Sequence, residues 1–115
     1  MKFLLAIYES STYWDEHDPE RDAREDREHS AFVAWLKAND ITHVGHALTS
    51  PETARTFRRG DDGSILEEEG PFQRDPAMIA GFYLFDAPDL DAARAIARRC
   101  PYEPGFGGEL RAIDA

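Results

Sequence analysis

Apolar runs alternate with polar, turn-forming segments along this chain, and each run predicts one element. Residues 3–8 form a continuous apolar run, which is typical of a strand buried on both faces. Asp18 followed by Pro19 predicts the start of a helix, because aspartate caps helices and proline suits the first turn. This helix is expected to end at Asn39, with a charged first half. Its second half carries apolar residues at helical spacing: Phe32, Trp35 and Leu36.

The rest of the chain predicts further strands and a second helix. Turn residues at 60–63 predict a hairpin. Asp89 is expected to cap the second helix, which ends before Pro101. The predicted strands cover residues 41–49, 53–59, 80–85 and 108–113, with a hairpin partner beginning at Ser64. The predicted apolar stripe of the second helix comprises Leu90, Ala93, Ala97 and Cys100.

This order of elements predicts an α+β fold, a ferredoxin-like βαββ(β)αβ sheet with two helices on one face. Strands 3–8 and 80–85 present apolar side chains to both faces, whereas two helices can cover only one face. An uncovered apolar face favours a symmetric partner. We therefore expect a homodimer whose sheets face each other around a cavity.

Composition narrows the possible partners and compartment. A chain of 115 residues is expected to form a single domain over residues 1–115. Its net charge of −10 would be repelled by phosphate backbones and anionic lipids, so neither nucleic acid nor a membrane is expected as a partner. One cysteine indicates a reducing compartment. The first apolar run ends at Glu9, too early for a secretion signal, so we expect a cytoplasmic protein.

Among the four histidines, His29 is the strongest candidate for acid–base chemistry. It shares the apolar stripe of Phe32 and Leu36, so its ring is expected to point at the sheet. The ordinary pKa of histidine, about 6.5, suits proton exchange near neutral pH. Glu25, one turn earlier, is expected to hold one ring nitrogen. The alternative is a structural histidine bonded to a backbone carbonyl.

No metal or cofactor site is predicted. His43 and His46 are three residues apart on a strand, so they point to opposite faces and cannot share a metal. His17 lies in an acidic segment that is expected to be exposed. Cys100 is expected to be a buried, inert thiol, because the negative end of a helix disfavours a thiolate. The glycines at 105–108 lack the strand-then-helix context of a dinucleotide loop.

Aromatic residues are candidates for binding a small organic ligand. Tyr8 and Tyr83 lie on the two apolar strands, where aromatic walls with polar tips suit such a molecule. The alternative for any single ring is core packing. Trp14, in the polar loop after the first strand, is either a lid residue or a cover for a helix end.

Four segments are informative in their order and spacing: the first strand ending in Tyr8, the glycine-containing strand at 44–48, the Gly-Pro-Phe at 70–72 and the strand at 81–84. Through these segments the chain resembles the YCII-like family, in its DGPF branch, over nearly its whole length. His29 lies where many members carry a helix histidine, and His46 lies at a position that is often acidic. Glu69 replaces the aspartate of the signature, and residues 73–76 lack its usual lysine.

The resemblance implies a dimeric α/β barrel and says less about activity. In YCII-like proteins a histidine–aspartate pair has been proposed as the site, and one relative is a dehydrochlorinase acting on a chlorinated aromatic. Members of the DGPF branch are often encoded beside extracytoplasmic-function sigma factors. Cys100 stands where another branch has an acid, so His29 alone carries over.

Two functions follow as hypotheses. In the first, a small cytoplasmic dimer binds a small organic molecule, with an aromatic compound as one option, and catalyses proton transfer or elimination with His29 as acid or base. The predicted substrate-binding residues are Tyr8, Trp14, His46, Phe72 and Tyr83. The alternative is a non-catalytic regulatory or ligand-sensing protein linked to sigma-factor-dependent transcription.

Overall fold

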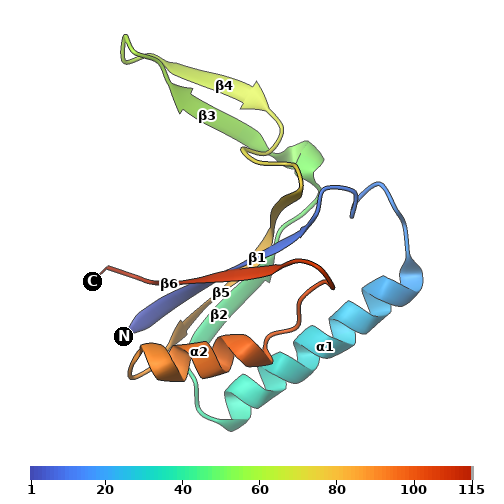
Figure 1. Cartoon of the computed structure of the whole chain (residues 1–115), viewed down its shortest axis with the longest axis vertical. Coiled ribbons are helices and arrows are strands. Elements are labelled where there is room, and N and C mark those ends of the chain that lie inside the picture. The colour runs from blue at the N-terminus through green and yellow to red at the C-terminus, as the bar shows by residue number, and fades with distance from the viewer. Residues whose placement is uncertain (115) are drawn as a thin grey trace.

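A four-stranded antiparallel sheet, with two helices against one face and a hairpin projecting from one end, forms the molecule (Figure 1). This computed structural model describes residues 1–114. The strands are β1 (Lys2–Ser10), β2 (His43–Ala47), β3 (Arg55–Arg59), β4 (Ile65–Glu69), β5 (Ala77–Asp86) and β6 (Gly107–Ala112). The helices are α1 (Pro19–Ala38), the short 3₁₀ helix η1 (Pro51–Thr53) and α2 (Leu90–Arg99).

The main sheet has the strand order β2-β5-β1-β6, with every neighbouring pair antiparallel. The two most apolar strands, β1 and β5, therefore occupy its centre. The helices α1 and α2 connect strands that are not neighbours and lie on the same side of the sheet (Figure 1). This arrangement confirms the predicted ferredoxin-like α+β fold.

Both helices begin where the sequence predicts. The Asp18 carboxylate accepts a hydrogen bond from the Arg21 backbone N–H at 3.1 Å, and Asp89 accepts one from Ala92 at 2.8 Å. Such caps satisfy backbone donors that a helix leaves unpaired at its first turn. The predicted stripe of α2 is wrong at Leu90, which is the first residue of the helix and is 55% exposed.

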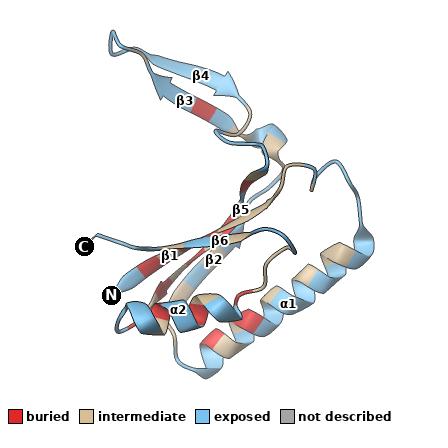
Figure 2. Ribbon diagram, in the orientation of Figure 1, coloured by how far each residue is buried: buried red, intermediate tan, exposed pale blue. Residues whose placement is uncertain are grey.

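The core lies between the helices and one face of the sheet, which we call the helix face (Figure 2). Phe3, Leu5 and Phe85 project from this face and pack against the α1 and α2 side chains. The buried residues of the two helices are Phe32, Leu36, Ala93 and Ile96. Because side chains alternate along a strand, this face uses every second residue of β1 and β5.

The opposite face, which we call the open face, is also apolar but is not covered by a helix. Leu4 and Leu84 pair at its centre and are half-buried, while Val44 beside them is 45% exposed. Charged residues lie at its β6 edge, where the Arg111 guanidinium lies 3.0 Å from the Glu109 carboxylate. The predicted surplus of apolar side chains is therefore present on the open face.

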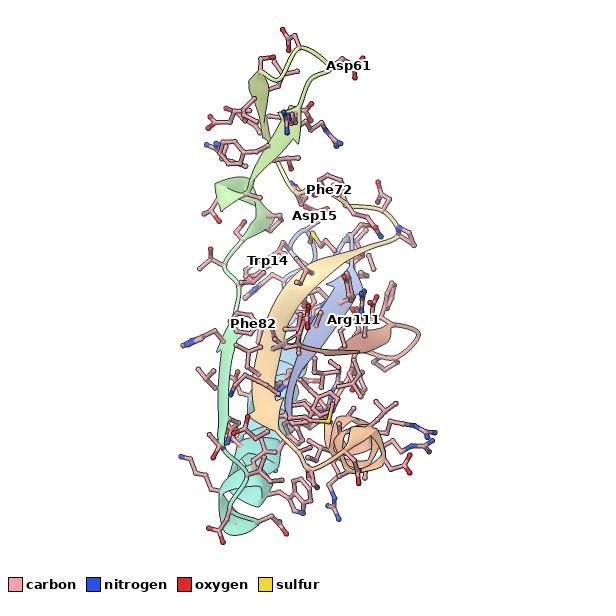
Figure 3. All side chains as sticks on the ribbon, turned by 90° about the vertical axis from the view of Figure 1, so that its left-hand side faces the viewer. Trp14, Asp15, Asp61, Phe72, Phe82 and Arg111 are labelled. Atoms are coloured by element: carbon pink, nitrogen blue, oxygen red, sulfur yellow. The ribbon has the colours of Figure 1, made fainter. Side chains whose placement is uncertain are left out.

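The hairpin departs from the prediction because β3 and β4 do not join the main sheet. They form a separate two-stranded sheet, and the Cα radius of gyration is 16.0 Å, against roughly 13 Å for a compact chain of this length. Figure 3 shows Asp61 at the tip of the hairpin and Phe72 near its base. The strand expected at residues 53–59 begins later, because η1 occupies its first residue, and β2 is shorter than predicted.

None of the helices within residues 1–114 is both long enough and apolar enough to cross a membrane.

Candidate functional site

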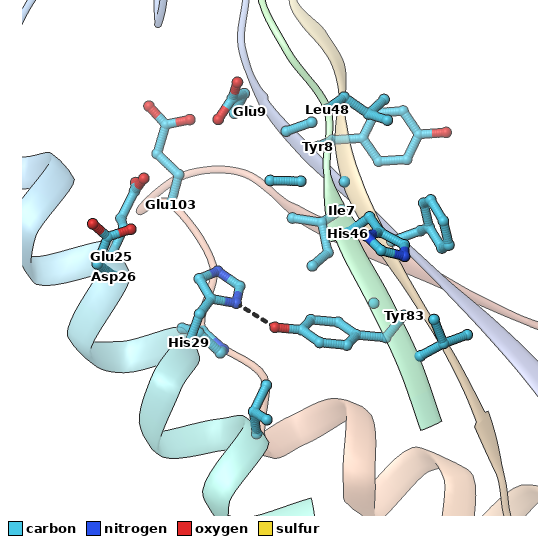
Figure 4. Close-up of a pocket in the computed structure, with 18 of the residues that line it drawn as sticks. Ile7, Tyr8, Glu9, Glu25, Asp26, His29, His46, Leu48, Tyr83 and Glu103 are labelled. Carbon is cyan, nitrogen blue, oxygen red and sulfur yellow. Dashed lines mark hydrogen bonds between the residues drawn. The ribbon is translucent and has the colours of Figure 1, made fainter. Parts of the chain in front are cut away.

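A cavity of about 530 Å³ lies between the sheet and α1, which lines it from Glu25 to Lys37 (Figure 4). Its lining comes from β1, β2, β5, α1, the loop after β1 and the segment after α2. The apolar lining includes Ile7, Val33 and Trp14. Its volume falls in the range of cavities that hold small organic molecules.

His29 and Tyr83 form a hydrogen-bonded pair inside this cavity. The Nδ1 atom of His29 lies 2.8 Å from the Tyr83 hydroxyl oxygen (Figure 4). The two rings are stacked at a centroid distance of 5.9 Å, and the edge of Phe32 packs against the Tyr83 ring at 5.1 Å. His29 therefore points at the sheet, as its helical spacing predicts. The packing of these rings holds Tyr83 beside His29.

A glycine on the neighbouring strand makes room for the Tyr83 ring. Gly45 pairs with Tyr83 across β2 and β5, and a Cβ atom at position 45 would lie 2.6 Å from the Cε1 atom of Tyr83. That separation is much shorter than any van der Waals contact, so a side chain there would displace the ring. Gly45 thus positions the Tyr83 hydroxyl toward His29.

Burial keeps both members of the pair uncharged near neutral pH. It lowers the pKa of His29 from 6.5, against the attraction of nearby carboxylates on α1. Burial also raises the pKa of Tyr83 to about 12. A neutral imidazole and a neutral phenol can each donate or accept a proton, so the pair can pass a proton to or from a bound molecule.

The predicted hydrogen bond from His29 to Glu25 is wrong. The Glu25 carboxylate instead accepts a hydrogen bond from the Tyr13 hydroxyl at 2.7 Å. The cause is the loop after β1, which brings Tyr13 over the first turns of α1. Glu25 still lines the cavity and acts on His29 only through its charge.

Three glutamates from distant parts of the chain line one end of the cavity (Figure 4). Glu9 comes from β1, Glu25 from α1, and Glu103 from the segment after α2. The Glu103 carboxylate accepts a hydrogen bond from the Ser10 backbone N–H at 2.7 Å. Burial, followed by the charges of Glu25 and Glu103, raises the pKa of Glu9 from 4.5 to about 7.

The loop after β1 places Trp14 at the mouth of the cavity, where its residue is 45% exposed. Arg21 holds this loop from α1. Its guanidinium lies 4.1 Å from the centre of the Tyr13 ring and donates hydrogen bonds to the carbonyls of Tyr13 and Glu16. The position of Trp14 is compatible with the predicted lid role.

The remaining predicted ligand-binding residues lie apart from His29. Tyr8 and His46 belong to the cavity lining, but the strand registers place their side chains on the open face, with Phe82. In Figure 4 both lie beyond β2 from His29. Phe72 is 73% exposed outside this cavity, where the Arg58 guanidinium lies 4.6 Å from its ring centre. The structure thus brings Tyr83 to His29, but neither His46 nor Phe72.

The structure agrees with the predictions for His43, His46 and Cys100. His43 and His46 pair with Phe85 and Phe82, on opposite faces as predicted. Cys100 is buried, and burial raises the pKa of its thiol to about 12, which agrees with the predicted inert thiol. Within the described chain, no three histidine, cysteine or acidic side chains are grouped so that they could hold a metal ion.

The fold and the cavity define a class: small ferredoxin-like α+β proteins with a histidine on the first helix facing the sheet. Within that class, the chain belongs to the YCII-related family, whose domain model matches residues 1–112. It is similar to an uncharacterised protein of Rhizobium meliloti (strain 1021). The two share 28% identity over 99 residues, which cover 85% of this chain and 78% of that protein.

Sequence reasoning missed Glu9, Gly45 and Glu103 as site residues. Glu9 did carry a signal, because a charged residue directly follows the apolar run of the first strand. For Gly45 the only signal in the sequence was the resemblance of its segment to a glycine-containing second strand. Glu103 gave no signal, since its place depends on how the segment after α2 returns to the start of the loop after β1.

Proposed function

We propose that this protein binds a small organic molecule in the cavity beside His29 and that His29 exchanges a proton with it. The observation that carries the proposal is the hydrogen bond between His29 and Tyr83 inside an open, partly apolar cavity. A histidine that served only to fill the core would be surrounded by side chains, whereas His29 borders a space of about 530 Å³.

The hydrogen bond determines which atoms meet the ligand. When Nδ1–H of His29 donates to the Tyr83 oxygen, Nε2 keeps its lone pair and is the base. When the Tyr83 hydroxyl donates to Nδ1, Nε2–H is the donor instead. Both forms are neutral, and the lowered pKa of His29 keeps its ring neutral at neutral pH. The pair therefore suits general acid or base catalysis, which typically contributes about 10²- to 10⁴-fold in rate.

The proposal includes a second copy of the chain on the open face. Leu4, Val44 and Leu84 form an apolar centre there, and the Glu109–Arg111 ion pair forms a polar edge. An apolar centre with a polar rim is the usual anatomy of a protein interface. The side chains of Tyr8 and His46 also lie on this face, so a partner sheet there would cover them.

Binding is tested by protein-observed NMR with phenol and 2-indanone, two small uncharged ring compounds. We expect both probes to shift the resonances of His29 and Tyr83, and His29→Ala to abolish binding while the protein stays folded. Phe72→Ala is the matched control, because Phe72 lies outside the cavity, and it should bind the probes as the wild type does. Unchanged affinity in His29→Ala would contradict the proposal, as would probe shifts confined to residues outside the cavity.

A further inference from the structure

The hairpin of β3 and β4 leaves large apolar side chains in water on both of its faces. Phe57 and Ile65 are 59% and 63% exposed, and Leu66 is 56% exposed. Phe57 pairs with Glu67 across the hairpin, and side chains alternate along a strand. Phe57 and Ile65 therefore share one face, and Leu66 lies on the opposite face. Because a two-stranded hairpin alone is at best marginally stable in water, this one needs further contacts.

Hydrogen bonds to the rest of the chain hold the base of the hairpin. The Thr56 hydroxyl donates a hydrogen bond to the Gly70 carbonyl at 2.8 Å, and Thr56 is buried. The Gly70 backbone N–H donates in turn to the Ala54 carbonyl at 3.0 Å. The three exposed apolar residues lie farther toward the tip, in a sheet that is separate from the main sheet. The direction of the hairpin is thus set at its base, while its outer part is left uncovered.

The hairpin extends to the side of the molecule on which the open face lies. Figure 1 shows the hairpin turning away from α1 and α2, which lie on the other side of the main sheet. Figure 3 is drawn from the side of the open face and shows its residues Phe82 and Arg111 below the hairpin. A second body bound to the open face would therefore lie beside the hairpin.

The open face alone is smaller than a typical protein interface. Its strands β2, β5, β1 and β6 contain 5, 10, 9 and 6 residues. At about 3.3 Å per residue and about 4.8 Å between strands, this face measures roughly 500 Å². A specific interface buries about 800 Å² on each partner, so a stable pair of chains needs additional contact area. The hairpin supplies apolar area on the same side of the molecule.

We infer that the hairpin is a dimerisation arm, which packs against the second copy of the chain bound to the open face. The inference rests on the proposed function, which includes that copy. In a twofold pair each chain contributes the same surface, so every contact made by the hairpin occurs twice. A second copy therefore covers both open faces and contacts both hairpins in one association step.

Sedimentation equilibrium over a series of concentrations tests the role of the hairpin. A variant with both Phe57→Ser and Leu66→Ser loses one apolar side chain from each face of the hairpin. It should raise the dimer dissociation constant at least about a hundredfold, because each loss occurs twice. Asp61→Ser, at the tip of the hairpin, is the matched control and should change this constant by less than about fivefold. A rise in the double variant no larger than that of the control would overturn the inference.

A spin label on the hairpin tests its contact with the second copy directly. Asp61→Cys introduces a thiol at the tip, whereas Cys100 is buried, so a thiol-reactive nitroxide should attach to the tip. This chain is mixed with isotope-labelled wild type, whose NMR signals should broaden. The same spin-labelled chain carrying Val44→Glu is the control and should cause no broadening. Dimers that form without broadening would overturn the inference and leave the second copy on the open face standing.

The outcomes also separate this inference from ligand binding. Probe binding beside His29 is a separate measurement, so its failure in a protein whose dimers depend on the hairpin would refute the ligand proposal alone. A wild type that sediments as a single chain would overturn the dimerisation arm together with the proposed second copy, whatever the probes show.

Discussion

The two faces of the main sheet have similar apolar composition but opposite surroundings. On the helix face, Phe3 and Leu5 are almost completely buried beneath α1 and α2. On the open face, Leu4 and Leu84 come from the same strands and remain half-buried. Since neighbouring residues of one strand supply both faces, the difference comes from what covers them and not from the strands.

This difference separates the face that stabilises the single chain from the face on which we propose that a second copy binds. The helix face holds the core, and the same face continues into the cavity with His29. The open face contributes little to a single chain, because its side chains are only partly removed from water. We therefore expect changes on the two faces to alter different measured quantities.

The largest expected effect comes from adjacent residues that point to opposite faces. Leu5→Ala should reduce the free energy of unfolding by about 3 kcal/mol, because Leu5 is 1% exposed and its loss leaves a cavity in the core. Leu4→Ala should cost about 1 kcal/mol in the single chain and weaken association instead. Urea unfolding of both variants measures the difference. Equal losses at the two positions would remove the distinction between the faces.

A smaller effect is expected at the glycine beneath Tyr83. Gly45→Ala should cost about 1 to 3 kcal/mol, because the added methyl group would clash with the Tyr83 ring. It should also break the His29–Tyr83 hydrogen bond and raise the affinity of His29 for protons, as seen in its NMR titration. Gly107→Ala is the control, since a Cβ there meets nothing within 4 Å. An undisturbed His29 in Gly45→Ala would contradict the positioning role.

The smallest effect concerns the pH dependence of stability at Glu9. Its pKa rises from 4.5 to about 7 on folding, so the folded chain holds this proton more tightly. The contribution to stability is complete below pH 4.5 and is lost as the pH rises toward 7. Glu9→Gln should therefore stabilise the protein at pH 8 by about 1 kcal/mol, allowing for screening by solvent, and leave it unchanged at pH 4. Urea unfolding at both values measures this, and a loss of stability at pH 8 would contradict the raised pKa.

The sequence predicted the parts of the fold that depend on local pattern. Apolar runs located the strands, the Asp18 and Asp89 caps located the helices, and the glycine turn at 60–63 located the hairpin. These elements were predictable because neighbouring residues specify each of them. The direction of the hairpin was not predictable, since β3 and β4 have the same alternation whether they extend the main sheet or leave it.

The sequence predicted a residue of the candidate site only where helical spacing indicated which side chains are buried. His29 was found because it shares the stripe of Phe32 on α1. Its partner was assigned to Glu25, one turn away, yet the hydrogen bond goes to Tyr83, 54 residues later. Glu103 also reaches the cavity through tertiary packing. Spacing along one helix carries no information about such partners.

Sedimentation equilibrium of the wild-type chain and Val44→Glu tests the contrast between the two faces most directly. We predict that the wild type sediments at twice its chain mass of 13.0 kDa at micromolar concentration. Val44→Glu, which places a charge on the open face, should sediment as one folded chain with unchanged circular dichroism. A wild-type protein that sediments as a stable single chain would contradict the account.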